Sequence, residues 1–289
     1  WPGEGAGRRC DGRLVIDWLC LLAFGGSLLP PHLGPSGTGS GGSGSGGSGP
    51  SGQNYAVSGS AALDPRALEE VAGLTSSTPD SLDVQAGWFE AGAVYGVDRD
   101  GTSLVFFGEN GGNDLHFALR EGRPDDFIRA RLMPSVIAAM TAQLDRILSV
   151  DLGPAPITRV VIQGQFPIGC LPSYVIGRRA QRGSAPSDFD DLGCVSSVNA
   201  ISDLENQLIR SDIIPAVSAR HPSVSIVFLD SSAAFRYILA HAPRLGFYNL
   251  IDTYCYDATG ATHCWDPWTY IGWDGVHMTD AVNRALVDL

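Results

Sequence analysis

Four short apolar runs recur along the chain, and each ends at a glycine or an aspartate. They occupy residues 53–58, 103–107, 157–162 and 224–229. Near-continuous apolar runs of this length are typical of strands that are buried on both faces, as in parallel sheets. We therefore predict four strands at these positions.

Between the runs, apolar residues recur at helical spacing. The two clearest helical stripes are Ile137, Met140, Leu144, Leu148 and Val198, Ile201, Leu204, Leu208. Strands that alternate with helices predict an α/β sandwich with a parallel sheet. In such sheets the functional loops gather at the carboxyl ends of the strands. We therefore expect Gly59, Asn113 and the loop after Gly164 to lie along one edge.

Residues 36–52 are almost entirely glycine and serine. Such a segment cannot bury apolar surface, and as a flexible coil it would span about 20–25 Å. One interpretation is an interdomain linker, but only about 35 residues precede it, too few for an ordinary domain. We interpret it as an insertion within a single domain that comprises residues 1–289.

The composition narrows the class of protein. Hydrophobic residues make up 44% and charged residues 17%, which is ordinary for a protein with a core. The net charge of −12 disfavours nucleic acids and anionic membrane surfaces as partners. No run of 18 apolar residues occurs, so we expect no membrane span. Residues 14–29, with arginines ahead of them, have two interpretations: a secretory signal or an amphipathic helix of the fold.

Six cysteines are present, and none forms a Cys-x-x-Cys pair, which argues against a structural zinc site. Cys170 and Cys194 flank a polar loop, and Cys255 and Cys264 flank a loop with glycine and threonine. Both pairs are candidate disulfides, which would indicate an oxidising compartment. The alternative is six buried thiols in a cytosolic protein.

The pair Asp274 and His277 is a candidate for acid–base chemistry. We expect the two residues at the start of a helix, where side chains three positions apart face the same way. A carboxylate can then hold the imidazole Nδ1–H, so that Nε2 takes a proton from a hydroxyl. Taken by itself, the spacing is more typical of a helix N-cap aspartate beside an incidental histidine.

Two further segments contain candidate donors for an oxyanion. Asn113 follows the strand predicted at 103–107, where its side-chain N–H is suited to the oxygen of a tetrahedral intermediate. The backbone N–H of Gly59 is a second candidate. Each has a structural alternative: a Gly/Asn turn in the first case, and a glycine chosen for backbone freedom in the second.

Taken together, these segments resemble the plant GDSL esterase/lipase family of the SGNH hydrolase superfamily. Five segments match the family blocks in order: Arg9-Cys10-Asp11-Gly12-Arg13-Leu14-Val15-Ile16-Asp17, residues 52–59, Gly111-Gly112-Asn113-Asp114, Gln165-Phe166-Pro167-Ile168-Gly169-Cys170-Leu171-Pro172, and Trp273-Asp274-Gly275-Val276-His277-Met278-Thr279. The resemblance covers nearly the whole chain. It implies a three-layer αβα sandwich and a carboxylic ester hydrolase.

The resemblance also assigns roles. His277 would deprotonate a serine with Asp274 orienting it, and Gly59 N–H and the Asn113 side chain would hold the oxyanion. It implies a small-molecule or lipid ester as substrate, no cofactor and no metal. It further implies a secreted protein, and we expect a monomer.

The chain departs from the family in its first block. The Gly-Asp-Ser-Leu motif should lie upstream of Arg9, so we expect the nucleophile, and the first strand of the sheet, to be missing from these 289 residues. We also expect the end of the domain to be incomplete, since Leu289 falls inside the helix after His277. Phe24-Gly25-Gly26-Ser27-Leu28 is similar to the missing motif. However, Ser27 follows a helix expected at 11–18 instead of preceding it, and Gly26 replaces the aspartate.

Two hypotheses follow. The first is an ester hydrolase whose N-terminal piece is missing from this sequence. The second is a non-catalytic derivative, either a gene fragment or a pseudoenzyme that binds acylated ligands. Losing the serine of a triad costs about 10⁶ in turnover, so the chain as written is expected to be nearly inert. An extracellular binding protein would leave Asn113, Asp274 and His277 in catalytic order unexplained.

Overall fold

The computed structural model describes residues 8–23, 28–33, 52–93, 103–153, 155–257 and 262–289. The chain forms two compact units. We call residues 30–165 and 203–230 the sheet unit. Residues 1–29, 166–202 and 231–289 contain both ends of the chain, and we call them the terminal unit. Each unit is described by itself.

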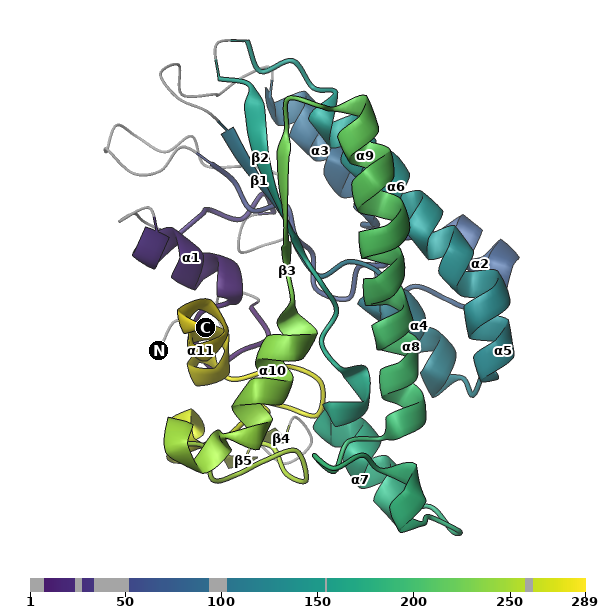
Figure 1. The fold of residues 1–289 in the computed structure, drawn as a ribbon, viewed down its shortest axis with the longest axis vertical. Helices are drawn as coiled ribbons and strands as arrows, with labels where there is room; N and C mark the ends of the chain where they lie inside the picture. The colour runs from purple at the N-terminus through teal and green to yellow at the C-terminus, as the bar shows by residue number, and fades with distance from the viewer. Residues whose placement is uncertain (1–7, 24–27, 34–51, 94–102, 154, 258–261) are drawn as a thin grey trace. The chain divides into compact units, whose positions relative to one another are not determined.

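In its described residues, the sheet unit is built on three parallel strands, β1 (Ser103–Phe107), β2 (Ile157–Gln163) and β3 (Ser225–Leu229), in the order β1-β2-β3 (Figure 1). In the register of the sheet, Phe106 lies beside Val161 and Val161 beside Val227. Three of the four predicted strands are therefore confirmed, and they pair in parallel as the alternating pattern predicted.

The two faces of this sheet differ in burial, which corrects one expectation. Val160 and Ile162 are fully buried on one face, whereas Leu104 is 40% and Val227 56% exposed on the other. The strands are thus not buried on both faces. An apolar run shows that both faces of a strand are hydrophobic. Whether each face is buried depends on the elements that pack against it.

The fourth predicted strand, at 53–58, is wrong. Among the described residues, Asn54 forms only an isolated parallel bridge with Pro31, in which Asn54 N donates to the Pro30 carbonyl and His32 N donates to the Asn54 carbonyl. The Asn54 side chain instead accepts from Ala56 N at 2.9 Å, a local turn that competes with strand pairing.

The same unit also contains helices. They are α2 (Pro65–Ala72), α3 (Leu82–Ala93), α4 (Gly112–Arg120), α5 (Asp125–Phe127), α6 (Met133–Leu148) and α9 (Ile214–Arg220). Helix α6 packs against α3 and α9, and α9 packs against β3 (Figure 1). The helix predicted from Ile137, Met140, Leu144 and Leu148 is confirmed as α6, and all four side chains are buried.

Two helices contain a π-helical turn just before a proline. Residues Ile128–Leu132 lie before Pro134 in α6, and Ile209–Ile213 lie before Pro215 in α9. A proline inside a helix cannot donate its backbone hydrogen bond, and its ring clashes with the preceding turn. The wider π turn accommodates the proline, so the helical path continues through it.

Helix α8 (Ser196–Leu208) confirms the second helical prediction, but its buried face is largely polar. Ile201 is fully buried, whereas Val198, Leu204 and Leu208 are only partly covered. The buried polar side chains of the helix are Asn199, Ser202, Glu205 and Asn206. The apolar stripe therefore predicted where the helix lies, but it did not predict which of its side chains are buried.

Among its described residues, the terminal unit contains short helices, the first part of α8 and the β4–β5 hairpin. Its elements are α1 (Val15–Ala23), η2 (Ile168–Cys170), α7 (Pro172–Ala180), η3 (Pro186–Asp188), α10 (Ser231–Ala240), η5 (Ala242–Leu245), β4 (Tyr256–Asp257), β5 (Thr262–His263), η6 (Pro267–Thr269) and α11 (Asp280–Asp288). Helix α11 packs against α1, α10 and η6. The indole of Trp18 in α1 has the guanidinium groups of Arg13 and Arg284 over it, at 4.8 and 5.0 Å from the ring centroid.

The apolar region at 14–29 forms a helix, α1, over residues 15–23, later than the helix expected at 11–18. In the part of the chain that the structure describes, no helix has the length and apolar character needed to cross a membrane. The Gly/Ser segment at 36–51 and Ser27 lie outside the described residues.

Two disulfides lie in the terminal unit. They join Cys170 to Cys194 and Cys255 to Cys264, the two pairs that flank loops in the sequence. Cys10 and Cys20 are buried free thiols. The first disulfide ties η2 to the segment that leads into α8, and the second closes the loop that contains the β4–β5 hairpin.

Candidate active site

Asp274 and His277 form a hydrogen-bonded pair in the terminal unit. The imidazole Nδ1 lies 2.8 Å from Asp274 Oδ2 and 3.0 Å from Oδ1. The side chain of His277 is 42% exposed and that of Asp274 26%. With Nδ1 facing the carboxylate, Nε2 is the ring nitrogen left to exchange a proton with another group.

The pair lies in a loop and not at a helix start, which corrects the sequence prediction. Helix α11 begins at Asp280, and Thr279 is its N-cap residue. Asp274 Oδ1 accepts from the backbone N–H groups of Val276 and His277, each at 2.7 Å. This local turn satisfies the backbone through the aspartate side chain, so the segment needs no helix to bring the two side chains together.

Backbone contacts fix this loop on both sides. Trp273 N donates to the His277 carbonyl at 2.8 Å, and Ser173 N at the start of α7 donates to the Gly275 carbonyl at 2.9 Å. The ring of Trp273 stacks on Tyr256 of β4, with 5.2 Å between centroids. The pair is therefore held by α7 and by the hairpin as well as by its own turn.

The electrostatics favour an ionised Asp274. Burial by itself raises the pKa of this carboxyl, but the hydrogen bond and charge of His277 and the N–H groups of Val276 and His277 outweigh it. The net result is an Asp274 pKa below its usual range. A carboxylate that stays ionised can orient the imidazole and stabilise its protonated form.

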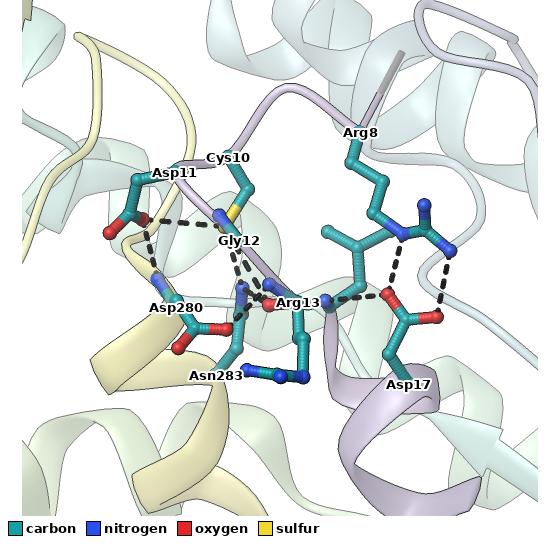
Figure 2. A network of polar contacts seen from close by, with 9 residues as sticks. Arg8, Cys10, Asp11, Gly12, Arg13, Asp17, Asp280 and Asn283 are labelled. Carbon is teal, nitrogen blue, oxygen red and sulfur yellow. Dashed lines mark hydrogen bonds and ion pairs between the residues drawn. The ribbon is translucent and has the colours of Figure 1, made fainter. Parts of the chain in front are cut away.

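A polar network anchors the helix that follows the pair (Figure 2). Asp11 Oδ1 accepts from Asp280 N at 2.7 Å, and Asp280 Oδ1 accepts from Arg13 N. Asn283 Nδ2 donates to the Arg13 carbonyl at 2.9 Å. Gly12 passes so close that an added Cβ would lie 2.7 Å from Asp280 Oδ1. Segment 8–14 and the start of α11 are therefore one packed structure.

Burial shifts two side chains of this network toward their neutral forms. It raises the pKa of the Cys10 thiol, with a further contribution from the negative charge of Asp11. It also raises the pKa of the Asp11 carboxyl. Arg8 balances the remaining buried carboxylate, since its Nε lies 2.6 Å from Asp17 Oδ2. A buried, neutral thiol such as Cys10 has little nucleophilic character.

Asn113 lies in the first turn of α4, in the sheet unit. Its Nδ2 donates to the Ser60 carbonyl at 2.8 Å, which fixes the orientation of the half-buried side chain. An amide nitrogen has two hydrogens, so one remains for a further acceptor. This contact also brings Asn113 to the segment that contains Gly59.

Gly59 has a conformation and surroundings that exclude a side chain. Its φ is +81°, in the left-handed region, and an added Cβ would lie 2.5 Å from Ser77 Oγ. The Ser77 hydroxyl donates to the Gly59 carbonyl at 2.8 Å. The bend at this position therefore depends on glycine.

Asp114, for which sequence reasoning assigned no role, links the Gly59 segment to α4. Its two carboxylate oxygens accept from Ala62 N at 2.7 Å and from Leu63 N at 3.1 Å. The side chain is fully buried, and burial raises the pKa of Asp114 to about 6. In the sequence, this role of Asp114 is indicated only by its position next to Asn113 in the Gly-Gly-Asn-Asp segment.

Sequence reasoning also missed a buried amide link to the glycine-rich loop, residues 108–112. Asn206 Oδ1 accepts from Gln165 N at 2.7 Å, and Asn206 Nδ2 donates to the Gln165 carbonyl at 3.0 Å. Gln165 Nε2 in turn donates to the Asn110 carbonyl at 2.8 Å. The loop after Gly164 therefore meets the loop after β1, as the parallel topology predicted. Nothing in the helical stripe of α8 marked Asn206 as a buried contact.

The candidate residues thus form two groups, each defined within its own unit. Asp274 and His277 make up the group in the terminal unit, and Gly59 and Asn113 make up the group in the sheet unit. Asp274 and His277 are hydrogen-bonded to each other. Asn113 is hydrogen-bonded to Ser60, the residue that follows Gly59.

Comparison with known proteins places the whole chain in one family. A family model described as GDSL-like Lipase/Acylhydrolase matches residues 3–289. A GDSL esterase/lipase of Arabidopsis thaliana is 32% identical, with 81% of this chain and 74% of the relative aligned. Acetylajmalan esterases 1 and 2 of Rauvolfia serpentina are 29% and 30% identical, over 100% and 99% of this chain and 75% and 78% of their own lengths.

Proposed function

The chain belongs to the GDSL-like lipase/acylhydrolase family of carboxylic ester hydrolases, and from this premise we propose that it uses a Ser-His-Asp mechanism. The observation that carries the proposal is the Asp274–His277 pair, whose Nδ1–Oδ2 distance is 2.8 Å. A serine hydroxyl is a weak nucleophile near neutral pH and needs a neighbouring base. His277 is the base, and Asp274 holds its tautomer.

In this proposal His277 Nε2 accepts the proton of the serine as its oxygen attacks the ester carbonyl. The protonated imidazole then donates that proton to the leaving alcohol, and water repeats the sequence to release the acid. The lowered pKa of Asp274 supports this role, because an ionised carboxylate stabilises the imidazolium formed in each step.

The oxyanion donors in this proposal are Gly59 N–H and the second hydrogen of Asn113 Nδ2. Two features support the assignment. The hydrogen bond from Asn113 to Ser60 fixes the amide before substrate arrives, and Asp114 holds residues 62–63 against the same helix. Donors that are already oriented need no reorganisation when negative charge develops on the oxygen.

The nucleophile in the proposal is the serine of a Gly-Asp-Ser-Leu motif, and this motif does not occur in the 289 residues. A second candidate function is a non-catalytic protein that binds acylated ligands. The two are separated by chemistry: only the first forms a covalent bond with an organophosphate.

We propose an ester as substrate, in the class of small-molecule or lipid esters. Two relatives are named acetylajmalan esterases, so an acetate ester is a suitable first probe. The single domain over 1–289, the monomeric state and secretion stay proposals. The two disulfides support secretion, because such bonds persist in oxidising compartments.

The test compares hydrolysis of p-nitrophenyl acetate and labelling by a fluorophosphonate. Two proteins are needed: the 289-residue chain and the translation product of its full transcript. We expect labelling at one serine of a product that contains the Gly-Asp-Ser-Leu motif, and none of the 289-residue chain. H277A and D274N should abolish or strongly reduce both signals, the latter by about 10⁴ in kcat.

A matched control is D288N, an exposed aspartate of α11 in the same unit as Asp274. It should leave both signals unchanged. Labelling of the 289-residue chain that depends on His277 would contradict the assignment of the nucleophile. No hydrolysis and no labelling by either protein, with retained binding of a fatty acid, would instead support the non-catalytic function.

A further inference from the structure

Glu205 is a fully buried carboxyl group for which the proposed reaction has no use. It lies in the part of α8 that belongs to the sheet unit, and its side chain is 0% exposed. Among the described residues, no donor lies at hydrogen-bonding distance and angle to either carboxyl oxygen. A buried polar group without a partner is expensive, so its persistence at this position requires an explanation.

The carboxyl group packs against the loop that leads to Asn113. An added Cβ at Gly111 would collide with Glu205 Oε1 and would lie 2.9 Å from Val136 Cγ1 of α6. The φ of Gly111 is +91°, so the chain turns sharply at this contact. Helix α4 begins at the next residue, and Asn113 is its second residue.

The surroundings of Glu205 disfavour its ionised form. Burial raises its pKa well above the usual range, and the negative charges of Asp114 in α4 and Glu109 in the loop after β1 raise it further. A hydrogen bond with the Gln165 side chain acts in the opposite direction and lowers the pKa, but burial and the two negative charges outweigh it. A carboxyl group that keeps its proton is a hydrogen-bond donor, unlike a carboxylate.

The amide oxygen of Gln165 is a buried acceptor with no donor among the described residues. Its amide nitrogen donates to the Asn110 carbonyl, so the amide oxygen must face away from that carbonyl. Gln165 Oε1 is buried and has no hydrogen-bond partner among the described residues. It lies against Gly112, where an added Cβ would be 2.7 Å away. Glu205 and Gln165 therefore touch two consecutive glycines of one turn.

We propose that Glu205 is a positioning residue: a neutral carboxylic acid whose O–H donates to Gln165 Oε1, and which thereby holds the Gly111–Gly112 turn and the start of α4. The pair satisfies two buried groups at once. It completes a path from α8 through Asn206, Gln165 and Asn110 to the turn before Asn113.

The effect on turnover rests on the proposed function of Asn113, whereas the effect on the turn does not. Ionisation of Glu205 would place a third negative charge near Asp114 and Glu109 and would remove the donor. The turn would then lose its support from α8, and the Asn113 amide would lose its fixed orientation toward Ser60.

The test uses three variants of the full chain. E205Q keeps the shape and supplies an N–H donor without a proton to lose. E205A removes the donor. E109Q is the matched control, because Glu109 is an exposed glutamate next to the same turn. The measurements are carboxyl ¹³C NMR of glutamate-labelled protein and hydrogen exchange of peptide 108–114, corrected for intrinsic rates.

One glutamate resonance should stay at its protonated position at neutral pH, be absent from E205Q, and titrate at lower pH in E109Q. Exchange of peptide 108–114 should rise about tenfold in E205A, the change that corresponds to one lost hydrogen bond. E205Q should match the wild type at neutral pH. In a preparation that hydrolyses esters, E205A should lower kcat by up to about 10²-fold while KM changes little.

Titration of every glutamate in the ordinary acidic range would overturn the proposal, as would equal exchange in E205A and E205Q. A structural role in general stability would increase exchange across α6 and β2 as well, and it would not be rescued by glutamine. If hydrolysis is absent but the NMR and exchange results hold, the failure lies in the proposed function and not in the role of Glu205.

Discussion

At the scale of single residues, Gly59 meets two separate requirements. Its φ of +81° is costly for any other residue, and Ser77 Oγ occupies the place of a Cβ. Gly122 meets only the first, since its φ is +69° and no atom of the described residues lies within 4 Å of an added Cβ. A substitution at Gly122 therefore measures the cost of the backbone conformation alone. A substitution at Gly59 measures that cost together with the cost of displacing Ser77.

We expect G122A to lower the free energy of unfolding by about 1 kcal/mol and G59A by more, up to about 3 kcal/mol. The larger loss in G59A reflects displacement of Ser77, which donates to the Gly59 carbonyl. Urea unfolding of both variants measures the difference. Equal losses would show that the contact with Ser77 contributes nothing.

Asp114 determines a second effect at this scale, the dependence of stability on pH. Its pKa is about 6 in the folded protein and has a reference value of 3.8. Between these values the folded protein binds more protons than the unfolded chain, so the free energy of unfolding falls as pH rises. A difference of about two pKa units corresponds to about 3 kcal/mol.

The variant D114N should therefore lose less stability than the wild type as pH rises from about 4 to 6. At pH 4 the free energy of unfolding of D114N should be lower than that of the wild type, since an amide has one acceptor oxygen for the N–H groups of Ala62 and Leu63. Denaturant unfolding at several pH values gives the difference between the two proteins. D151N, an exposed aspartate, is the control and should follow the wild type. A constant difference between D114N and wild type across this range would contradict the role of burial.

At the scale of elements, the two disulfides close loops of different length. The cysteines are 24 positions apart in Cys170–Cys194 and 9 apart in Cys255–Cys264. The longer loop restricts the unfolded chain more, so its removal should cost more. The first pair also ties η2 to the start of α8, and the second closes the hairpin beside Trp273.

We expect C170A with C194A to lower the free energy of unfolding by about 3–4 kcal/mol, and C255A with C264A by about 2–3 kcal/mol. Urea unfolding without reductant measures both. As a control, reductant should lower the free energy of unfolding of the wild type toward the values of the double variants. A larger loss from the shorter loop would indicate that hairpin packing, rather than loop closure, dominates.

At the scale of the whole molecule, the net charge of −12 should steer small ions. Trp265 is 95% and Trp268 61% exposed, so both report on ions near the terminal unit. Relative to free N-acetyltryptophanamide, caesium should quench their fluorescence better than iodide, by about twofold at low salt.

This preference should fade as the salt concentration rises to about 0.15 M, where the screening length is about 8 Å. Stern–Volmer titrations at two ionic strengths provide the measurement, and W265F with W268F identifies the signal. A preference that does not change with salt would show that local contacts, and not the net charge, govern the approach of ions.

The sequence by itself determined the class of fold and the identity of most candidate residues. Apolar runs gave β1, β2 and β3, and helical spacing gave α6 and α8, because these patterns record which side chains must leave water. The Gly-Gly-Asn-Asp and Asp-x-x-His segments identified Asn113, Asp274 and His277, because the chemistry requires particular side chains at short spacing. The roles of these residues in catalysis stay predictions.

Tertiary structure alone decided the rest. The strand predicted at 53–58 is a single bridge, since the Asn54 side chain forms its own turn. One face of the sheet is exposed at Leu104 and Val227, and the Asp274 turn replaces a helix start. The buried contacts of Asp114, Gln165, Glu205 and Asn206 join segments far apart in sequence. Local patterns record the burial that each segment needs, whereas such contacts depend on which segments meet, and that is settled only when the chain folds.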